Sequence, residues 1–340
     1  MANKKMPDKT VNTVKLDIGK SGNDKDIYIC SKARYLNTLT IGSKGTGKSS
    51  FIMPTFIAQD LKNKNLGLTI ITSRKDMSYY IQAMANDEKR KITLIKPTLN
   101  PNIENRLFDG LMEIKQIEES SGFSGGALYD LVNEDFINYK NAIKRKHIVV
   151  IDMENLQYGD QSVEAVLLFL KQLEIDIQET KVTNKTNHFV YIDDANYYLK
   201  GLTNLLEFGN EYNLGFNLFI RSRSQLVVNG VDYRSLIDDN IRTTILLNSL
   251  NQDDIDFYSK RFTNLNIDFY NRDANSVVYD SINSNFKRIS GVSSLPISDE
   301  NYINNLNLVS AKRKNKLIKK RDKDNENKKK ELLRETAIDS

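Results

Sequence analysis

The residues from Gly42 to Ser50 have the types and spacing needed to bind the phosphates of a nucleotide. Positions 42–49 read Gly-Ser-Lys-Gly-Thr-Gly-Lys-Ser and match the pattern G-x-x-x-x-G-K-S/T. The glycines allow a tight turn that directs successive backbone N–H groups at phosphate oxygens. In this pattern Lys48 reaches the β- and γ-phosphates, and the Ser49 hydroxyl binds Mg²⁺. We therefore expect ATP and Mg²⁺ as cofactors, bound by Gly42, Ser43, Lys44, Gly45, Thr46, Gly47, Lys48, Ser49 and Ser50.

A phosphate loop that supports hydrolysis also needs carboxylates at the end of a second strand. The apolar run His188–Ile192 ends in Asp193 and Asp194, and the apolar run His147–Ile151 ends in Asp152. An adjacent pair can divide the work, because one carboxylate binds Mg²⁺ and the other polarises the attacking water. The sequence therefore favours Asp193 as the metal ligand and Asp194 as the catalytic base. Asp152 is the alternative, and otherwise it caps the end of a neighbouring strand.

The segment after a third apolar run, Phe216–Ile220, carries two arginines and a glutamine at Arg221, Arg223 and Gln225. Ligands of parallel sheets bind at the carboxyl ends of the strands. Either arginine could sense the γ-phosphate or act across a subunit interface, and Gln225 could contact nucleotide or DNA. We include all three with Lys48 among the candidate catalytic residues. The alternative is that this segment is a solvated loop.

Alternating strands and helices are expected to position these residues. The run Leu39–Ile41 suits a buried strand before the phosphate loop, and Ser49–Leu61 suits a helix after it. Further strands are expected at Gly67–Ile71, Ile92–Ile95, His147–Ile151, His188–Ile192, Phe216–Ile220 and Thr243–Leu247, and helices at Met77–Asn86, Val163–Ile177, Leu202–Tyr212 and Gln252–Phe262. This order predicts an α/β fold of three layers, in which helices cover both faces of a mostly parallel sheet.

Two β-hairpins are expected outside this alternation. Val14–Ile18 and Ile27–Cys30 predict an N-terminal hairpin that leads into the core sheet, and residues 277–279 with 286–289 predict a late one. Asn251 is expected to cap the helix that begins at Gln252. Gly215 is expected to end the helix that precedes Phe216.

We divide the chain into an N-terminal extension with its hairpin (1–35), an ATPase domain (36–310) and a basic charged tail (311–340). Residues 99–146 have no clear pattern and are treated as a variable insertion in the ATPase domain. The whole chain has a net charge of +5, and from residue 312 onward 12 Lys and Arg stand against 6 Asp and Glu. The tail therefore carries the entire positive excess. It is expected to contact a nucleic-acid backbone or an acidic partner, or else only to solvate the chain.

Composition also restricts the cellular setting. The single cysteine, Cys30, excludes a disulfide framework or a zinc cluster within one chain, and a reducing compartment is expected. No N-terminal stretch has the form of a signal peptide. The apolar runs are much shorter than the roughly 20 residues that span a bilayer. We therefore expect a cytoplasmic chain with no direct membrane span, which a partner could recruit to the membrane.

Four stretches together resemble the FtsK/HerA superfamily of P-loop motors, and most of all the TraG/VirD-type coupling ATPases of type IV secretion. They are Leu39–Ile57, Thr69–Ile81, His188–Asn196 and Tyr212–Leu226, and the likeness extends over roughly residues 14–310. The resemblance implies a RecA-like fold and self-association into a ring, such as a hexamer, with ATP between subunits. It also implies DNA as a partner, double-stranded or as a transferred strand, and a relaxase or secretion-channel proteins as further partners.

The chain departs from the usual pattern of this family at several positions. Asp194 stands where the family usually has Glu, and Ser73 where the second strand normally ends in Asp. Arg221 occupies the position of the sensor glutamine, and Asn210 falls where an arginine is common. The membrane-spanning N-terminus of most coupling proteins is not found, and the all-α insertion is missing or reduced to residues 99–146. The resemblance therefore implies a minimal, soluble relative.

These observations favour an ATP-hydrolysing motor that translocates DNA in the conjugative transfer of a plasmid or similar element. A viral or plasmid DNA-packaging ATPase of the same superfamily is the first alternative. The second is a slow ATP-binding adaptor that recruits a relaxase or another substrate. The altered base at Asp194, sensor at Arg221 and arginine position at Asn210 are what favour this second alternative.

Overall fold

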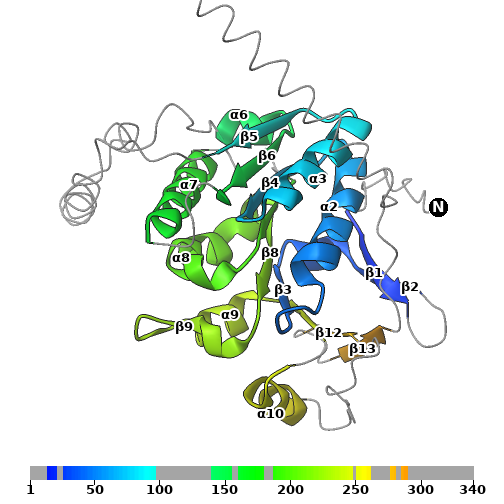
Figure 1. Cartoon of the computed structure of the whole chain (residues 1–340), viewed down its shortest axis with the longest axis vertical. Coiled ribbons are helices and arrows are strands. Elements are labelled where there is room, and N and C mark those ends of the chain that lie inside the picture. The colour runs from blue at the N-terminus through cyan, green and yellow to red at the C-terminus, as the bar shows by residue number, and fades with distance from the viewer. Residues whose placement is uncertain are drawn as a thin grey trace, which may run out of the picture.

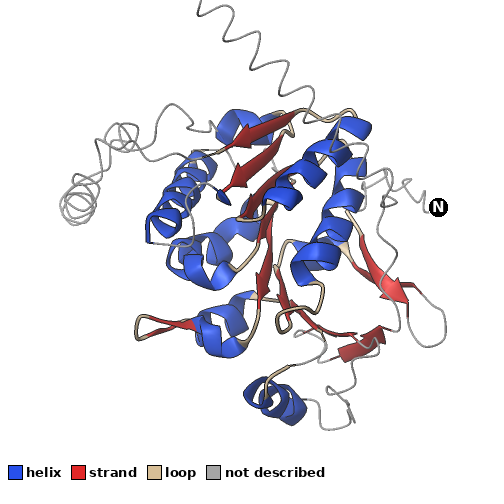
Figure 2. Cartoon of the chain, viewed as in Figure 1, coloured by secondary structure: helices blue, strands red, loops and turns tan. Residues whose placement is uncertain are grey.

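One sheet runs through the centre of the molecule, with helices on both of its faces (Figure 1 and Figure 2). The computed structural model describes residues 14–20, 26–96, 139–154, 160–179, 187–247, 250–261, 276–280 and 285–289. Within them, seven parallel strands lie in the order β11 (Thr243–Leu246), β3 (Thr38–Ile41), β8 (Leu214–Ile220), β7 (His188–Ile192), β4 (Gly67–Thr72), β6 (Ile148–Asp152) and β5 (Ile92–Ile95). An antiparallel pair, β12 (Ser276–Asp280) and β13 (Asn285–Ile289), extends the β11 edge.

Alternate side chains of the parallel strands face two separate apolar clusters. Leu68 and Ile70 of β4 belong to the first cluster, and Ile71 belongs to the second. The first is covered by α2 (Met53–Lys62) and α3 (Lys75–Asp87), and the second by α6 (Tyr139–Lys144), α7 (Asp160–Gln178) and α8 (Leu199–Phe208). Because both faces are buried, these strands are continuous apolar runs in the sequence. The predicted three-layer α/β fold is confirmed.

The N-terminal strands β1 (Leu16–Lys20) and β2 (Asp26–Ile29) form the predicted hairpin as a two-stranded sheet of their own. From it, α1 (Ser31–Arg34) leads into β3. The Gln59 side chain of α2 accepts a hydrogen bond from the Asp17 N–H at 2.8 Å and donates one to the Asp17 carbonyl at 2.8 Å. The Gln59 amide thus makes the pair of hydrogen bonds that a neighbouring strand would otherwise make to the backbone of β1.

The helix after the phosphate loop begins differently from the prediction. The sequence suggested one helix over Ser49–Leu61, whereas Lys48–Ile52 forms a π-helical segment and α2 begins only at Met53. Pro54 therefore lies in the first turn of α2, where its missing N–H removes no hydrogen bond of the helix interior. The change of helix type at Met53 explains how a proline is accommodated so close to the phosphate loop.

The end of α8 also differs from the prediction. We expected a helix over Leu202–Tyr212 that ends at Gly215, but α8 ends at Phe208 and a 3₁₀ turn, Gly209–Tyr212, follows it. Asn213 makes the reversal with a left-handed φ of 55°, a conformation that Asn tolerates better than most residues. Gly215 instead lies within β8, where a Cβ would be 2.6 Å from the Arg34 carbonyl oxygen. The glycine is required there by close packing against α1.

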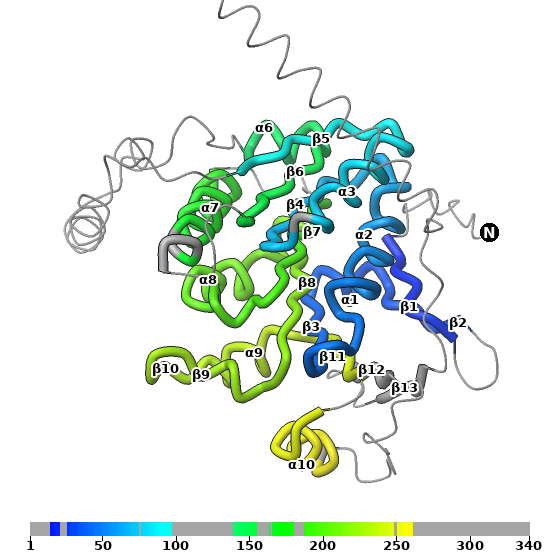
Figure 3. The backbone as a smooth tube through the Cα atoms, viewed as in Figure 1, coloured from blue at the N-terminus to red at the C-terminus, as the bar shows by residue number. Residues whose placement is uncertain are grey.

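The remaining elements follow β8. A short hairpin of β9 (Val227–Val228) and β10 (Val231–Asp232) precedes α9 (Arg234–Asn240), and α10 (Gln252–Arg261) follows β11, as the backbone trace shows (Figure 3). The Asn251 side chain accepts a hydrogen bond from the Asp254 N–H at 2.8 Å, which confirms the predicted cap of α10. Among the described helices, none combines the length and apolar content needed to cross a bilayer.

Some predictions lie outside the described residues. They concern the basic tail (311–340) and all but residues 139–146 of the variable insertion (99–146). The domain boundaries that we drew at residues 36 and 310 stay predictions.

Candidate nucleotide-binding and catalytic site

Three loops meet at the carboxyl edge of the sheet. Because β8 lies between β3 and β7, the loops that follow these strands are neighbours in space. The loop after β3 is the phosphate loop, the loop after β8 contains Arg221, and the loop after β7 contains Asp193 and Asp194. The Gly42 N–H donates to the Ile220 carbonyl at 3.3 Å, which ties the start of the phosphate loop to the end of β8. The topology therefore assembles one site from three separate segments.

The phosphate loop has a backbone that requires glycine at defined positions. Gly47 adopts a φ of 85°, a region that residues with a side chain rarely enter. A Cβ on Gly42 would lie 2.7 Å from Thr46 Oγ1 and 2.8 Å from the Leu247 Cβ atom. The Thr46 hydroxyl in turn donates to the Ser43 carbonyl at 2.9 Å. The loop is therefore a tight turn that leaves room for phosphates on its backbone N–H groups.

Lys48 is buried beside this loop and points along it. Its ammonium group donates to the Ser43 carbonyl at 3.0 Å and to the Gly42 carbonyl. Burial lowers the pKa of Lys48, while the charges of Asp193 and Asp194 act in the opposite direction and raise it. The ammonium group thus lies at the phosphate loop, close enough to Asp193 and Asp194 for their charges to act on it.

Ser49 and Asp193 are in direct contact. The Ser49 hydroxyl donates to Asp193 Oδ1 at 2.7 Å, and the Asp194 N–H donates to the same oxygen at 3.1 Å. Burial raises the pKa of Asp193, and the Ser49 hydroxyl partly offsets this by stabilising the carboxylate. Mg²⁺ in nucleotide sites is bound by one or two protein oxygens together with phosphates and water. A hydroxyl and a carboxylate at this separation fit that requirement.

Asp194 combines an unusual backbone conformation with an ionic contact. It adopts φ 48° and ψ 47°, which is the left-handed region. For a residue other than glycine this conformation costs on the order of 1 kcal/mol, and such conformations cluster at functional sites. Arg221 Nε lies 3.5 Å from Asp194 Oδ1, and 48% of the Arg221 side chain is exposed. Asp194 and Arg221, two of the four positions at which the sequence departs from the resembled pattern, therefore contact one another.

The other two residues of the Arg221 segment have different surroundings. Gln225 accepts a hydrogen bond from the Arg221 N–H at 2.8 Å, so its amide fixes the backbone of Arg221. The Arg223 guanidinium forms two hydrogen bonds to Asp238 of α9, at 2.6 and 3.0 Å, and stacks on the Phe257 ring of α10 at 3.6 Å. Arg221, and not Arg223, is therefore the arginine that the structure places beside the carboxylate pair.

Asp152, the alternative metal ligand, is buried at the end of β6 and paired with a lysine. Lys96 Nζ lies 2.7 Å from Asp152 Oδ2 and 3.4 Å from Glu154 Oε2. Strand β4 separates β6 from β7 in the sheet. The contact between Ser49 and Asp193 therefore supports Asp193 rather than Asp152 as the metal ligand.

Arg74 is a further candidate residue of this site, and the sequence patterns did not single it out. It follows β4, the strand beside β7, and its Nε donates to Asp76 Oδ1 at 3.1 Å. Its charge favours the ionised form of Asp193 and so acts to lower the pKa of that carboxyl group. The signal that could have identified Arg74 is a basic residue soon after β4, a buried strand that lies beside the strand ending in Asp193. The side chain of the next residue, Lys75, lies outside the described residues.

The strand order, with the phosphate loop directly after β3, gives this chain the α/β architecture of a RecA-like P-loop fold. Neither a protein-family model nor a curated protein sequence matches the chain. Solved structures of low sequence identity do match it in fold. VirB4 of Thermoanaerobacter pseudethanolicus gives a TM-score of 0.55 at 13% identity, with 83% of this chain and 96% of that chain covered.

The bacterial conjugative coupling protein TrwB is similar in fold to the same degree. Its form TrwBdeltaN70 gives a TM-score of 0.55 at 12% identity and covers 83% of this chain and 94% of its own. TrwB in complex with the non-hydrolysable ATP analogue ADPNP gives a TM-score of 0.50 at 13% identity, with 82% and 94% covered. The resemblance to FtsK/HerA-type ATPases is confirmed at the level of fold.

Proposed function

We propose that this chain is an ATP-hydrolysing motor that moves DNA, acting as a coupling ATPase in the conjugative transfer of a plasmid or similar element. The observation that carries the proposal is the 2.7 Å contact between Ser49 of the phosphate loop and Asp193 after β7. Asp194 and Arg221 lie beside this contact. Groups suited to bind phosphate, to bind a metal and to activate water thus meet at one edge of the sheet.

Each residue of the site has a separate role in this proposal. The backbone of residues 42–50 and the ammonium of Lys48 bind the phosphates, and Ser49 with Asp193 binds Mg²⁺. When bound, Mg²⁺ neutralises charge on the β- and γ-phosphates. Asp194 orients the attacking water and accepts its proton. Arg221 contacts the γ-phosphate, while Gln225 holds the Arg221 backbone in place.

DNA and a ring of identical subunits belong to the same proposal. They are supported by the likeness in fold to VirB4 and to the conjugative coupling protein TrwB, and by the excess of positive charge after residue 312. A hexamer is the assembly we propose, with a relaxase or secretion-channel protein as a further partner.

A slow ATP-binding adaptor is a second candidate function, and one observation favours it. The Asp194 carboxylate is within 3.5 Å of Arg221, so part of its charge is already neutralised by an ion pair. Asp is also one methylene shorter than Glu, and a base displaced by about 1 Å can lose on the order of 100-fold in rate. Both features would slow hydrolysis without preventing nucleotide binding.

The test is an ATPase assay of the full chain with and without duplex DNA, together with mass measurement in the presence of nucleotide. A motor should show turnover that DNA stimulates, and assembly into a ring when ATP is bound. Slow turnover that DNA leaves unchanged would instead support the adaptor. A chain that neither binds nor hydrolyses ATP would refute both candidates.

A further inference from the structure

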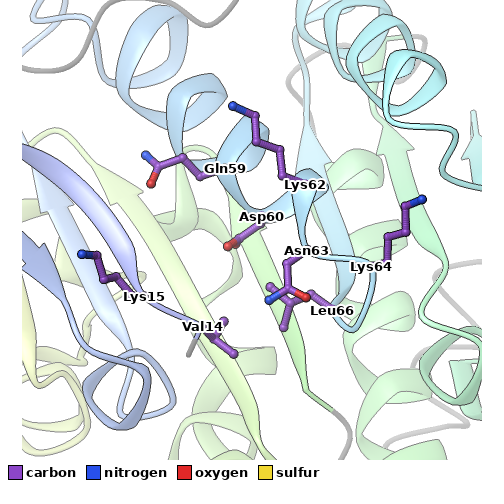
Figure 4. A pocket seen from close by; sticks show the side chains of 8 residues that line it. All are labelled: Val14, Lys15, Gln59, Asp60, Lys62, Asn63, Lys64 and Leu66. Carbon is purple, nitrogen blue, oxygen red and sulfur yellow. The ribbon is translucent and has the colours of Figure 1, made fainter. Parts of the chain in front are cut away.

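A pocket of about 520 Å³ opens between the residues that precede β1 and the end of α2 (Figure 4). Lys15 contributes to it from just before β1, Lys62 from the last turn of α2, and Lys64 from the turn that follows. All three side chains are exposed, and Figure 4 shows them on different sides of the pocket. We call these residues the lysine rim. No part of the phosphate loop lines the pocket.

The single carboxylate among the lining residues is already neutralised. Both oxygens of Asp60 accept hydrogen bonds from the Arg34 guanidinium, at 2.7 and 2.6 Å, and the Tyr191 hydroxyl donates to one of them at 2.6 Å. Arg34 is itself buried and lies 3.8 Å above the Phe189 ring. The Asp60 carboxylate is therefore already paired with Arg34. Among the described residues, the lysine rim has no carboxylate partner.

A second buried arginine, Arg90, does not line the pocket but binds the backbone at the end of α2 beside it. The Arg90 guanidinium donates to the Leu61 and Asn63 carbonyls at 2.9 Å each, at the C-terminal end of α2, and to the Lys146 carbonyl at 3.0 Å. The end of a helix carries a partial negative charge that repels anions. Arg90 offsets this charge. The pocket lining itself holds three lysines and one carboxylate, and that carboxylate is paired with Arg34, although the chain before residue 312 has no positive excess.

We infer that the lysine rim binds the phosphodiester backbone of nucleic acid. Lysines are flexible point charges that contact phosphates without reading base sequence. They lie around an open pocket rather than converging on one small anion, which suits successive phosphates of a strand (Figure 4). This inference rests on the proposed function, because it assigns a place to the nucleic-acid partner of the motor.

The two anion sites are separated by the whole length of α2. The phosphate loop leads through the π-helical segment Lys48–Ile52 into α2, and Lys62 is the last of the 10 residues of α2. At a rise of about 1.5 Å per residue, they are separated by roughly 15 Å along the helix. A ligand at the lysine rim therefore leaves the nucleotide site open, so nucleic acid and ATP can be bound at the same time.

The test compares two triple variants of the full chain that lose the same charge. One carries Lys15→Gln, Lys62→Gln and Lys64→Gln at the lysine rim. The control carries Lys171→Gln, Lys200→Gln and Lys260→Gln, which lie on α7, α8 and α10. Fluorescence anisotropy measures the binding of a labelled duplex of arbitrary sequence from about 50 to 200 mM salt. Melting temperature and ATP turnover without DNA check that both variants are folded.

The expected result is a selective decrease of DNA binding in the rim variant. Each lysine that no longer neutralises a phosphate should reduce the slope of log affinity against log salt by about 0.9, and all three by up to about 2.7. The control triple should keep the wild-type slope. Equal slopes for the rim variant and the wild type would overturn the inference while leaving a DNA-binding motor intact.

Two further results would also overturn the inference. If the wild-type chain hydrolyses ATP but binds no DNA, the inference and the DNA part of the proposed function both fail. Vesicles of phosphatidylcholine with phosphatidylserine are tested in parallel. Rim-dependent binding to these vesicles, without rim-dependent binding to duplex DNA, would reassign the pocket to a lipid headgroup.

Discussion

The Nε atom of Arg221 lies 3.5 Å from the Oδ1 atom of Asp194. The two residues follow β8 and β7, which are adjacent parallel strands, so the contact is a direct result of sheet order. In the proposed function Arg221 contacts the γ-phosphate and Asp194 accepts the proton of the attacking water. The contact therefore links the group that would detect the γ-phosphate to the group that would activate water.

Lys48→Ala is expected to abolish ATP hydrolysis and to weaken nucleotide binding strongly. The substitution removes the buried ammonium group that lies over the phosphate loop. The loss of a positioned cation in such a site is on the order of 100-fold or more in kcat. Turnover and ATP affinity are measured beside Lys200→Ala, an exposed lysine on α8, as the control. Normal hydrolysis by a folded Lys48→Ala protein would refute the proposal that the chain is an ATP-hydrolysing motor.

Asp193→Asn should eliminate turnover that depends on Mg²⁺, whereas Asp152→Asn should preserve most of it. Asp193 contacts Ser49 at 2.7 Å, while Asp152 is paired with Lys96 at 2.7 Å in another part of the sheet edge. Titration of turnover against Mg²⁺ concentration distinguishes the two variants. The opposite pattern would mean that β6, and not β7, carries the metal ligand.

Arg221→Ala is expected to reduce activity with little change in stability, whereas Arg223→Ala is expected to reduce stability. Arg221 is half exposed beside Asp194, so its loss should reduce kcat on the order of 100-fold with little change in melting temperature. Arg223 is buried and makes two hydrogen bonds to Asp238, so its loss should lower the free energy of unfolding by roughly 2 kcal/mol.

Kinetics and thermal unfolding of the same two preparations provide the check. Arg223→Lys is a useful companion, because lysine keeps the charge but cannot form the two-bond fork or the stack on Phe257. If Arg223→Ala reduced kcat as strongly as Arg221→Ala at temperatures where both are folded, the assignment of Arg221 as the phosphate-contacting arginine would be wrong.

His188 should make the protein less stable in acid. It is fully buried at the start of β7, and this burial, with a smaller effect of Lys146, lowers its pKa to about 3. The unfolded chain has a His pKa of about 6.5 and therefore binds one more proton than the folded chain between these values. The free energy of unfolding should fall as pH decreases from about 6.5 towards 3, by up to about 1.4 kcal/mol per pH unit.

His188→Gln tests this contribution, because Gln can still bond to the Thr69 hydroxyl, which lies 2.8 Å from His188 Nε2. Denaturant unfolding at several pH values should give a shallower dependence for the variant than for the wild type. An identical pH dependence would show that His188 takes up its proton without unfolding.

Removal of residues 312–340 is expected to weaken DNA binding and to flatten its salt dependence. This tail holds the positive excess of the chain, and each phosphate that it neutralises contributes about 0.9 to the slope of log affinity against log salt. A tail that neutralises three phosphates would therefore lower the slope by about 2.7 when it is removed. The melting temperature of the truncated chain should match that of the full chain. Unchanged affinity and slope would indicate that the tail binds a protein partner or only solvates the chain.

Most of the fold could be predicted from the sequence because its signals are local. A strand buried on both faces is a continuous apolar run, as in Phe189–Ile192 of β7, and it needs no knowledge of its neighbours. The phosphate loop is equally local, since its glycines and Lys48 lie within eight consecutive positions. The metal-binding carboxylate was inferred from the end of one such strand.

The features that could not be predicted depend on contacts between distant segments. Arg221 and Arg223 are two residues apart and chemically identical, and only Asp238 and Phe257 reveal that Arg223 is held elsewhere. Gly215 resembles a helix end in the sequence, but it is required by the approach of the Arg34 carbonyl from 181 positions earlier in the chain. A local sequence pattern cannot reveal which distant residue a side chain or a glycine contacts in the fold.

The exchange of two hydrogen bonds between Gln59 and the backbone of Asp17 has a mechanical consequence. It couples the N-terminal hairpin to α2, which follows the phosphate loop through the π-helical segment Lys48–Ile52. The hairpin cannot shift along α2 unless both bonds break together. Any movement of the phosphate loop that shifts α2 would therefore also act on the hairpin, and a displacement of the hairpin would act on the phosphate loop through the same helix.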